Sequence, residues 1–278
     1  MNRRRFLLSL PPSVFAPAAL ARASTVRFPR TSPVPGGVAR VPLGVAGPAP
    51  RVRTGGERVL VMRDGSEWVA LVGIALAMKP GSTLRVEAER AEGGVERHEV
   101  TVAPKAYASQ HLKVRPGQVE LSAEDLARYE RERAHLAGVI KTFSEEAPST
   151  LAMVQPTPGR RSSSFGLRRY FNGEARSPHG GMDIAAPVGT PVVAASAARV
   201  IDIGDYFFSG RTIVLDHGAG LLSLYAHLSG VDTTIAHNVA AGAPIAKVGV
   251  TGRVTGPHLH FSVYLNTVAV DPALFLQA

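Results

Sequence analysis

The sequence predicts a predominantly β protein with an N-terminal β-sandwich-like module, a linking helix and a C-terminal antiparallel β domain. Three observations favour this fold. Short alternating runs separated by turn signals recur through residues 24–118, one strongly charged segment after Ser122 has helical spacing, and strand-like runs resume beyond Ser164 without a convincing long helix. With 278 residues and 45% hydrophobic content, the chain can bury a sizeable core and is long enough for two domains.

The first residues have the pattern of an export signal. A basic cluster at residues 3–5 precedes an apolar run, and Ala21-Arg22-Ala23 has the small-x-small form of a signal-peptidase site. The run is short and broken by prolines, which disfavours a permanent membrane anchor. We therefore expect residues 1–23 to be a signal peptide, removed after export by the Sec route or by the twin-arginine route that Arg3-Arg4-Arg5-Phe6-Leu7 resembles.

The β-sandwich-like module is predicted over residues 24–118. Its Pro/Gly-rich stretch, residues 29–50, is expected to be extended and turn-rich rather than helical. Evenly spaced short strands follow, separated by turn signals that contain glycine. The predicted strands are residues 58–62, 68–74, 83–88 and 95–102, and the turn signals are Asp64-Gly65, Pro80-Gly81 and Gly93-Gly94.

A helix and a linker are predicted over residues 119–155. Ser122 is a suitable N-cap, and Glu124 and Asp125 follow it in the first turn. A broken apolar stripe continues to Ile140, so we expect one exposed helix over about residues 123–141. Residues 144–163 are rich in Ser, Thr and Pro and are expected to be a flexible linker between the two β modules.

The C-terminal β domain is predicted over residues 156–278. Apolar runs with strand character recur there, and no long helical pattern interrupts them. The predicted strands include residues 191–195, 198–203, 212–216 and 221–225.

Composition and charge restrict the partners. The chain has no cysteine, which excludes disulfides and thiolate metal ligands. Its formal net charge is +9, and loss of the four arginines in residues 1–23 leaves +9 − 4 = +5. A basic exported protein can bind nucleic acid, an anionic membrane surface or an anionic wall polymer. No basic run is interleaved with aromatic residues, so nucleic acid is disfavoured.

Three short patterns in the C-terminal domain carry candidate chemistry. His179-Gly-Gly-Met-Asp183 is expected on a tight loop leading into a strand, because glycine lets the backbone approach an ion closely. His258-Leu-His260, if it lies on a strand, directs both imidazoles to one face and Leu259 to the buried side. His227 ends an apolar strand and, taken alone, is typical of a structural histidine.

Together these residues fit a zinc enzyme. Such a site needs three imidazole or carboxylate ligands, one open position for water and separate groups that handle protons. His179, Asp183 and one histidine of the 258/260 pair would complete a two-histidine, one-aspartate site. The other histidine and His227 would lie beside the bound water, and the residues alone do not decide which member of the pair binds the metal.

The C-terminal motifs resemble those of the lysostaphin-type (LytM-like) zinc endopeptidases, in family order across about residues 160–275. They are Ser164-Phe165-Gly166-Leu-Arg168, His179-Gly-Gly-Met-Asp183-Ile-Ala-Ala-Pro187, Tyr225-Ala-His227-Leu228, Gly252-Arg-Val-Thr-Gly256-Pro257-His258-Leu259-His260-Phe261 and Val270-Asp271-Pro272.

This resemblance implies a domain with zinc in a groove, one ion per chain, held by His179, Asp183 and His260. His227 and His258 would then activate water and stabilise the oxyanion. Ser262 stands where many members carry Glu, which concerns only substrate detail. The remaining five histidines match no catalytic motif; they are His98, His111, His135, His217 and His237.

The resemblance also implies a function, a zinc metalloendopeptidase that hydrolyses peptide cross-links of peptidoglycan. Residues 24–141 are similar to the β-rich N-terminal module of some periplasmic members, so we expect a periplasmic enzyme. One alternative is a non-catalytic murein-binding regulator or amidase activator, but such members lack ligands or catalytic histidines that are present here. A peptidase for secreted proteins is another. The N-terminal module could dock over the groove and inhibit the enzyme, a hypothesis suggested by the predicted linker.

Overall fold

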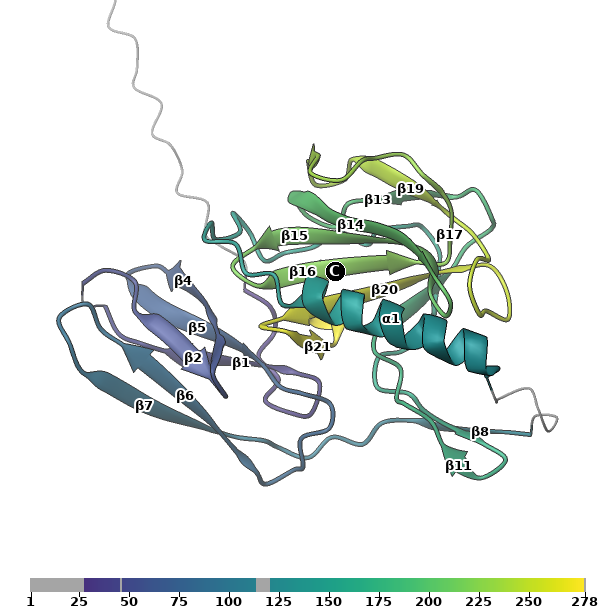
Figure 1. Ribbon diagram of the computed structural model, residues 1–278. Helices are drawn as coiled ribbons and strands as arrows, with labels where there is room; N and C mark the ends of the chain where they lie inside the picture. The colour runs from purple at the N-terminus through teal and green to yellow at the C-terminus, as the bar shows by residue number, and fades with distance from the viewer. Residues whose placement is uncertain (1–27, 46, 114–120, 278) are drawn as a thin grey trace, which may run out of the picture.

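The computed structural model describes residues 28–45, 47–113 and 121–277, so the predicted signal peptide lies outside the described residues. Within them the protein is mostly strand, with a single α-helix. Two β bodies lie side by side, and the helix crosses one face of the C-terminal body (Figure 1). The predicted fold class is therefore confirmed. No helix in the described ranges is long and apolar enough to cross a bilayer.

The N-terminal body is a sandwich of two antiparallel sheets, with strand orders β1-β5-β4 and β3-β2-β6-β7. Val41, Val72 and Val86 belong to the apolar core between them. The predicted strands of this region are present, and two further strands were not predicted: β1, within the Pro/Gly-rich stretch, and β2, directly after it. The strands are β1 (Val38–Pro42), β2 (Arg51–Thr54), β3 (Glu57–Arg58), β4 (Leu60–Asp64), β5 (Glu67–Gly73), β6 (Thr83–Glu89) and β7 (Val95–Thr101).

An eight-stranded antiparallel sheet is the centre of the C-terminal body, with the order β18-β14-β15-β16-β20-β12-β9 and β21 paired to β20. Its strands are β9 (Arg160–Ser163), β12 (Met182–Ala185), β14 (Ala198–Tyr206), β15 (Gly210–Gly218), β16 (Leu221–Ala226), β18 (Asn238–Val239), β20 (His258–Leu265) and β21 (Val268–Val270). A 3-10 helix, η1 (Pro272–Leu274), follows.

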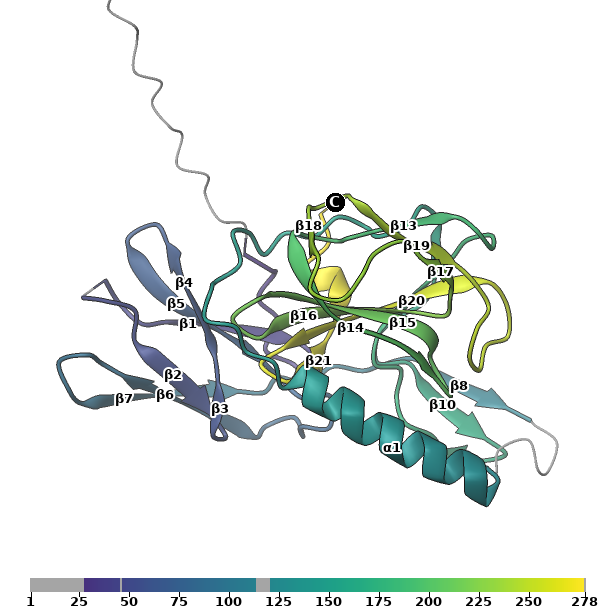
Figure 2. The same cartoon turned by 45° about the horizontal axis from the view of Figure 1, so that its top comes forward.

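A three-stranded sheet of β13 (Pro191–Val193), β19 (Pro244–Val248) and β17 (Leu228–Val231) covers one face of the large sheet (Figure 2). Leu259 and Phe261 of β20 point into the core between the two sheets, and both are fully buried. Because side chains alternate along a strand, His258 and His260 point to the opposite face. The expected orientation of the histidine pair is therefore observed.

Helix α1 (Ala123–Ile140) covers part of that opposite face. The Ser122 side chain accepts a hydrogen bond from the Asp125 N–H at the helix start, and the helix ends one residue before the predicted end. Leu136 and Val139 pack against Leu224 of β16. The helix and the two β20 histidines thus share one face of the large sheet, at different positions along it.

The prediction of a flexible linker over residues 144–163 is wrong. Leu151 and Met153 are fully buried in the C-terminal core, the Met153 N–H donates to the Phe275 carbonyl at 2.9 Å, and residues 160–163 form β9. The Ser/Thr/Pro composition suggested a solvated chain. The two apolar residues within it instead fix the segment to the domain, because their burial is favourable.

The two β bodies are packed together. Val38, Leu60 and Leu71 of the N-terminal sheets are fully buried in the same apolar cluster as Leu221 and Leu265 of the large sheet. Farther along the chain, β8 (Ser109–Leu112) pairs in parallel with β10 (Arg168–Phe171), which also pairs with β11 (Glu174–Ala175). The chain after β7 reaches β8 by running beneath the C-terminal body (Figure 1).

Candidate metal centre

The pairing of β12 with β20 brings together residues that are 77 positions apart in the sequence. In this antiparallel register Asp183 lies opposite His260, and Ala185 lies opposite His258. His179 lies in the loop before β12, where its N–H donates to the Leu167 carbonyl at 3.0 Å. The expected arrangement, a loop leading into a strand, is the one observed.

Three polar atoms converge at this point. Asp183 Oδ1 lies 3.0 Å from His179 Nε2 and 2.9 Å from His260 Nδ1, and the two nitrogens are 3.0 Å apart. Among the described residues this is the group that could hold a metal ion. The carboxylate oxygen only accepts hydrogen bonds, and neutral imidazoles also direct lone pairs inward, so a cation between the three atoms would satisfy all of them.

Outer contacts fix the orientation of both imidazoles. His179 Nδ1 donates to the Ser164 carbonyl at 2.9 Å, which leaves Nε2 as the acceptor facing Asp183. His260 Nε2 lies 2.9 Å from the Ser262 hydroxyl, which leaves Nδ1 facing Asp183. Ser262 was expected to concern only substrate detail, but the two-residue period of β20 places it against His260.

His227 and His258 lie beside this group. Their rings are 4.8 Å apart between centroids, and His258 Nε2 is 3.7 Å from Asp183 Oδ1. His227 Nδ1 donates to the Thr251 carbonyl at 3.0 Å, and His258 Nδ1 donates to the Gly256 carbonyl at 2.8 Å. In each neutral ring Nε2 is therefore the acceptor that remains for chemistry.

The backbone at His227 has a left-handed conformation, with φ of 64°, which is uncommon for a residue with a side chain. Its N–H donates to the Ser209 carbonyl at 2.8 Å, and its ring donates to Thr251. Two anchored contacts thus hold a backbone conformation that would otherwise be unfavourable.

The protonation states favour neutral imidazoles around a charged carboxylate. Burial raises the pKa of the Asp183 carboxyl, but the close contacts with the imidazoles of His179 and His260 together outweigh it and hold the pKa well below its usual range. Burial, with repulsion from His260, lowers the pKa of His227 to about 4. Burial also lowers the pKa of His260, although Asp183 opposes this change. Metal ions bind neutral imidazole and ionised carboxylate, so these states suit a metal centre.

We expect the metal-free protein to lose stability as the pH falls from 7 to 4. The unfolded His227 takes up a proton near pH 6.5, whereas the folded one does so only near pH 4, so the unfolded state binds more protons in between. The free energy of unfolding should fall by roughly 3 kcal/mol from this residue. Urea titrations at both pH values measure it, and His227→Gln should lose correspondingly less. An equal loss of unfolding free energy in the two proteins would contradict the assignment of this pH dependence to His227.

Gly181 is required where it stands. A Cβ added there would lie 2.5 Å from the Ser262 hydroxyl and 2.7 Å from His260 Nε2, whereas a Cβ on Gly180 would meet nothing within 4 Å. Gly181→Ala is therefore expected to displace His260 and weaken metal binding by about tenfold to a hundredfold, as the loss of a ligand's outer partner does. Competition with a chelator measures the affinity, and Gly180→Ala is the matched control. Unchanged metal affinity in Gly181→Ala would show that Ser262 and His260 can move away from the added methyl group without weakening the site.

A cleft of about 430 Å³ opens beside the centre. Its walls come from the β9, β10 and β12 region, from the loop before β20 and from β8. The lining residues are Gln110, Ser162, Ser163, Leu167, Arg169, Asp183, Ala185, Thr255, Gly256, Pro257 and His258. Sequence reasoning did not find Gln110 or Arg169, because no local pattern marks the pairing of β8 with β10.

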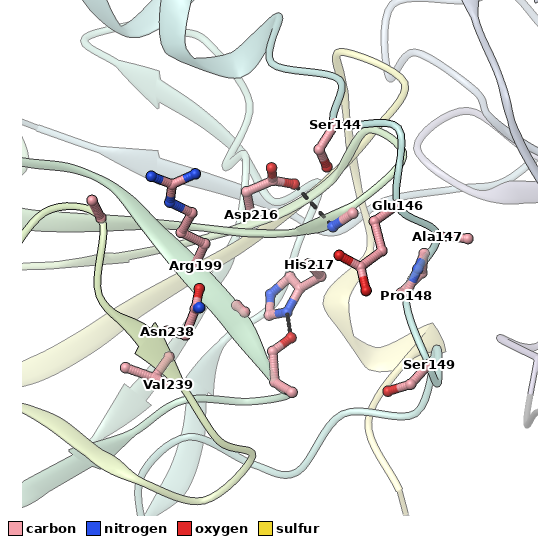
Figure 3. A pocket seen from close by; sticks show the side chains of 14 residues that line it. Ser144, Glu146, Ala147, Pro148, Ser149, Arg199, Asp216, His217, Asn238 and Val239 are labelled. Atoms are coloured by element: carbon pink, nitrogen blue, oxygen red, sulfur yellow. Dashed lines mark hydrogen bonds between the residues drawn. The ribbon is translucent and has the colours of Figure 1, made fainter.

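A larger cavity, about 610 Å³, is lined by Asp216, His217 and Arg199 rather than by the candidate site residues (Figure 3). His217 Nδ1 donates to the Ala197 carbonyl at 3.0 Å, and its Nε2 lies 2.7 Å from the Ser223 hydroxyl. Both ring nitrogens therefore have partners within the fold, as a histidine with a structural role would.

The other four histidines outside the motifs also make contacts away from the centre. His135 Nε2 lies 2.8 Å from Asp202 Oδ1, and the His111 ring stacks on a tyrosine 4.5 Å away. His98 lies 3.6 Å from a glutamate carboxylate, and His237 lies 3.1 Å from a threonine hydroxyl. The structure gives none of them a place in the metal group.

A two-histidine, one-aspartate donor set with an accessible side is typical of zinc hydrolases. Two family models match the chain, the M23 N-terminal domain at residues 31–102 and peptidase family M23 at residues 177–272. A crystal structure from Pseudomonas aeruginosa assigned to peptidase M23 is 42% identical, with 88% of this chain and 95% of that chain covered at a TM-score of 0.76. The chain belongs to peptidase family M23.

Several curated relatives carry functional names. The peptidoglycan DD-endopeptidase ShyA of Vibrio cholerae is 38% identical over 108 residues, which are 38% of this chain and 25% of that protein. The DD-carboxypeptidase/endopeptidase Mpg of Neisseria meningitidis is 40% identical over 113 residues, which are 41% of this chain and 26% of that protein. The matches thus span about a quarter of the length of these relatives.

Proposed function

We propose that this protein is a zinc-dependent endopeptidase that hydrolyses peptide cross-links of peptidoglycan. The observation that carries the proposal is the convergence of His179, Asp183 and His260, with His227 and His258 beside them. The names of the M23 relatives, peptidoglycan DD-endopeptidase among them, support the substrate class.

In this proposal His179 Nε2, Asp183 Oδ1 and His260 Nδ1 hold one zinc ion. When bound, zinc supplies a Lewis acid that polarises the scissile carbonyl and makes water more acidic. The chain's own residues fix the ligands in place, since the Ser164 carbonyl and the Ser262 hydroxyl orient the two imidazoles.

His227 and His258 are the proposed proton-handling residues. In each neutral ring the Nδ1–H donates a hydrogen bond to a backbone carbonyl. The unprotonated Nε2 can therefore accept a proton from the attacking water. Once protonated, the same Nε2 becomes a donor that can stabilise negative charge on the carbonyl oxygen. The low pKa of His227 keeps its ring neutral and ready to accept at neutral pH.

A non-catalytic murein-binding regulator or amidase activator is not favoured. Such a protein needs no complete ligand set, whereas here all five residues lie close together, and Asp183 and His258 among them line the cleft. Nothing in the geometry favours secreted proteins as the substrate.

The test is release of muropeptides from purified sacculi by the zinc-loaded protein, with and without a chelator, beside His258→Ala. We expect release that both the chelator and the substitution abolish. Zinc-loaded protein that releases nothing from sacculi would refute the proposed activity on this substrate, and zinc stoichiometry near zero would refute the metal assignment.

We further propose that the protein is exported to the periplasm by the Sec or the twin-arginine route and that residues 1–23 are removed after export. Mass spectrometry of the protein from a periplasmic fraction gives the mature N-terminus. A mature chain that retains residues 1–23 would refute this.

Inhibition of the site by the N-terminal module stays a prediction. Among the described residues before the helix, Gln110 of β8 is the one that lines the cleft. Any inhibition would therefore come from β8 rather than from the sandwich. Sacculus hydrolysis before and after cutting at a protease site engineered between residues 113 and 121 tests it. An increase after cutting would support inhibition, and unchanged hydrolysis would contradict it.

A further inference from the structure

A single cationic side chain faces the metal-site cleft. Arg169 of β10 and Asp183 are the charged residues, apart from His258, among the described residues that line it. The Arg169 side chain is 38% exposed, and its Nη2 lies 4.0 Å from Asp183 Oδ2, the carboxylate oxygen that does not face the histidines. At this distance the contact is at the outer limit of an ion pair.

The guanidinium retains donors for another acceptor. Arginine has five N–H donors in a rigid fork that matches a carboxylate. Within the described ranges, Asp183 is the acidic side chain at ion-pair distance from Arg169, and its charge is shared with His179 and His260. A metal ion held by Asp183 would neutralise more of the carboxylate charge and weaken its attraction for Arg169. The guanidinium could therefore bind an external anion.

Gln110 lies next to Arg169 on the same wall. The two residues are register partners in the parallel pairing of β8 with β10, and both line the cleft. Register partners in neighbouring strands direct their side chains to the same face of the sheet. Figure 2 shows β8 and β10 side by side, apart from the sandwich of β1 to β7. An amide donor therefore stands beside the guanidinium fork.

We propose that Arg169 and Gln110 form a subsite that binds a free carboxylate of the substrate next to the scissile bond. The inference rests on the proposed endopeptidase function and adds a choice of substrate. Cross-links made through diaminopimelate carry such a carboxylate, whereas glycine bridges carry none inside the bridge. The enzyme thus selects carboxylate-bearing cross-links, with Arg169 as the specificity-determining residue.

The test compares two synthetic cross-linked peptides that differ in one group, a free carboxylate or a carboxamide beside the scissile bond. The zinc-loaded full chain should hydrolyse the carboxylate peptide with a kcat/KM about tenfold to a hundredfold higher, as expected for charge-assisted bidentate binding. Arg169→Gln should lose this preference while it still hydrolyses the carboxamide peptide. Gln110→Glu should also lose it, because its added negative charge repels the carboxylate.

Arg160→Gln is the matched control. Arg160 lies on exposed β9 and does not line the cleft, so this variant loses the same charge and should keep the preference. If Arg169→Gln lowers the hydrolysis of both peptides equally, Arg169 acts through Asp183 and the subsite is refuted. An equal zinc affinity of Arg169→Gln and the unaltered protein would support the subsite.

Failure of the proposed function is distinguishable from failure of the subsite. If the unaltered protein hydrolyses neither peptide, the endopeptidase function fails, and calorimetric binding of the same two peptides decides the subsite. The subsite would be supported if the unaltered protein bound the carboxylate peptide more tightly than the carboxamide peptide and Arg169→Gln lost this difference. Equal binding of both peptides would overturn it.

Discussion

Asp183→Asn is expected to lose both the metal ion and the activity. The substitution keeps the size of the side chain but replaces an ionised carboxylate, held charged by two histidines, with a neutral amide. Loss of an outer partner of a ligand already costs tenfold to a hundredfold in metal affinity, so loss of a ligand's charge should cost at least about a hundredfold. Chelator competition measures the affinity, and peptide release from sacculi measures the activity.

His258→Gln gives the informative contrast. His258 Nε2 is 3.7 Å from Asp183 Oδ1, outside the triangle of three atoms that are about 3 Å apart. This variant should keep one zinc ion per chain and lose about a hundredfold or more in kcat, as the loss of a general acid–base group does. Loss of zinc from His258→Gln together with retention in Asp183→Asn would invert the assigned roles.

Local patterns were sufficient to predict strands β4 to β7 and β13 to β16 and the orientation of the histidine pair, but not β9, which lies within the predicted linker. His258-Leu-His260 lies on a strand, and the two-residue period buries Leu259 completely while both histidines face the site. Helix α1 also followed from its cap and its stripe. These features depend on residues within a few positions of one another, where sequence periodicity is informative.

The choice between His258 and His260 as a ligand could not be predicted from the residues alone. It depends on the register of β12 against β20, which places Asp183 opposite His260. A shift of two residues would place His258 opposite Asp183 and leave every side chain on its own face, so the alternation within either strand does not decide between the two histidines. The resemblance to the lysostaphin-type enzymes implied His260, whose Nδ1 lies 2.9 Å from Asp183 Oδ1, and its role as a ligand stays a prediction.

Long-range contacts explain what composition predicted wrongly or missed. Residues 144–163 have the composition of a solvated linker, yet Leu151 and Met153 are buried in a core assembled by distant strands. Arg169 and Gln110 come together through a parallel pairing across more than fifty residues, so neither has a local signal. Ser262 is different, because the two-residue period from His260 could have placed it.

The same long-range packing predicts that a fragment of residues 156–278 does not fold stably. The fragment starts at the domain boundary that was predicted from composition, and it therefore lacks Leu151 and Met153, which are fully buried. It also removes Val38, Leu60 and Leu71 from the same cluster. Loss of each large buried side chain costs about 2–5 kcal/mol, so the five together cost about 10–25 kcal/mol, enough to offset the roughly 5–15 kcal/mol by which a typical domain is stable.

A fragment of residues 143–278 is the matched comparison, because it keeps Phe143, Leu151 and Met153 against the C-terminal core and lacks, like the shorter fragment, the N-terminal contacts and helix α1. Thermal unfolding followed by circular dichroism should rank the full chain first, this fragment second and residues 156–278 last, with the shortest fragment showing no cooperative transition. If residues 156–278 unfold at the temperature of the full chain, the buried contacts contribute little. Poor hydrolysis by a folded short fragment would then reflect a change at its active site. If the short fragment is unfolded, its activity says nothing about inhibition by the N-terminal module.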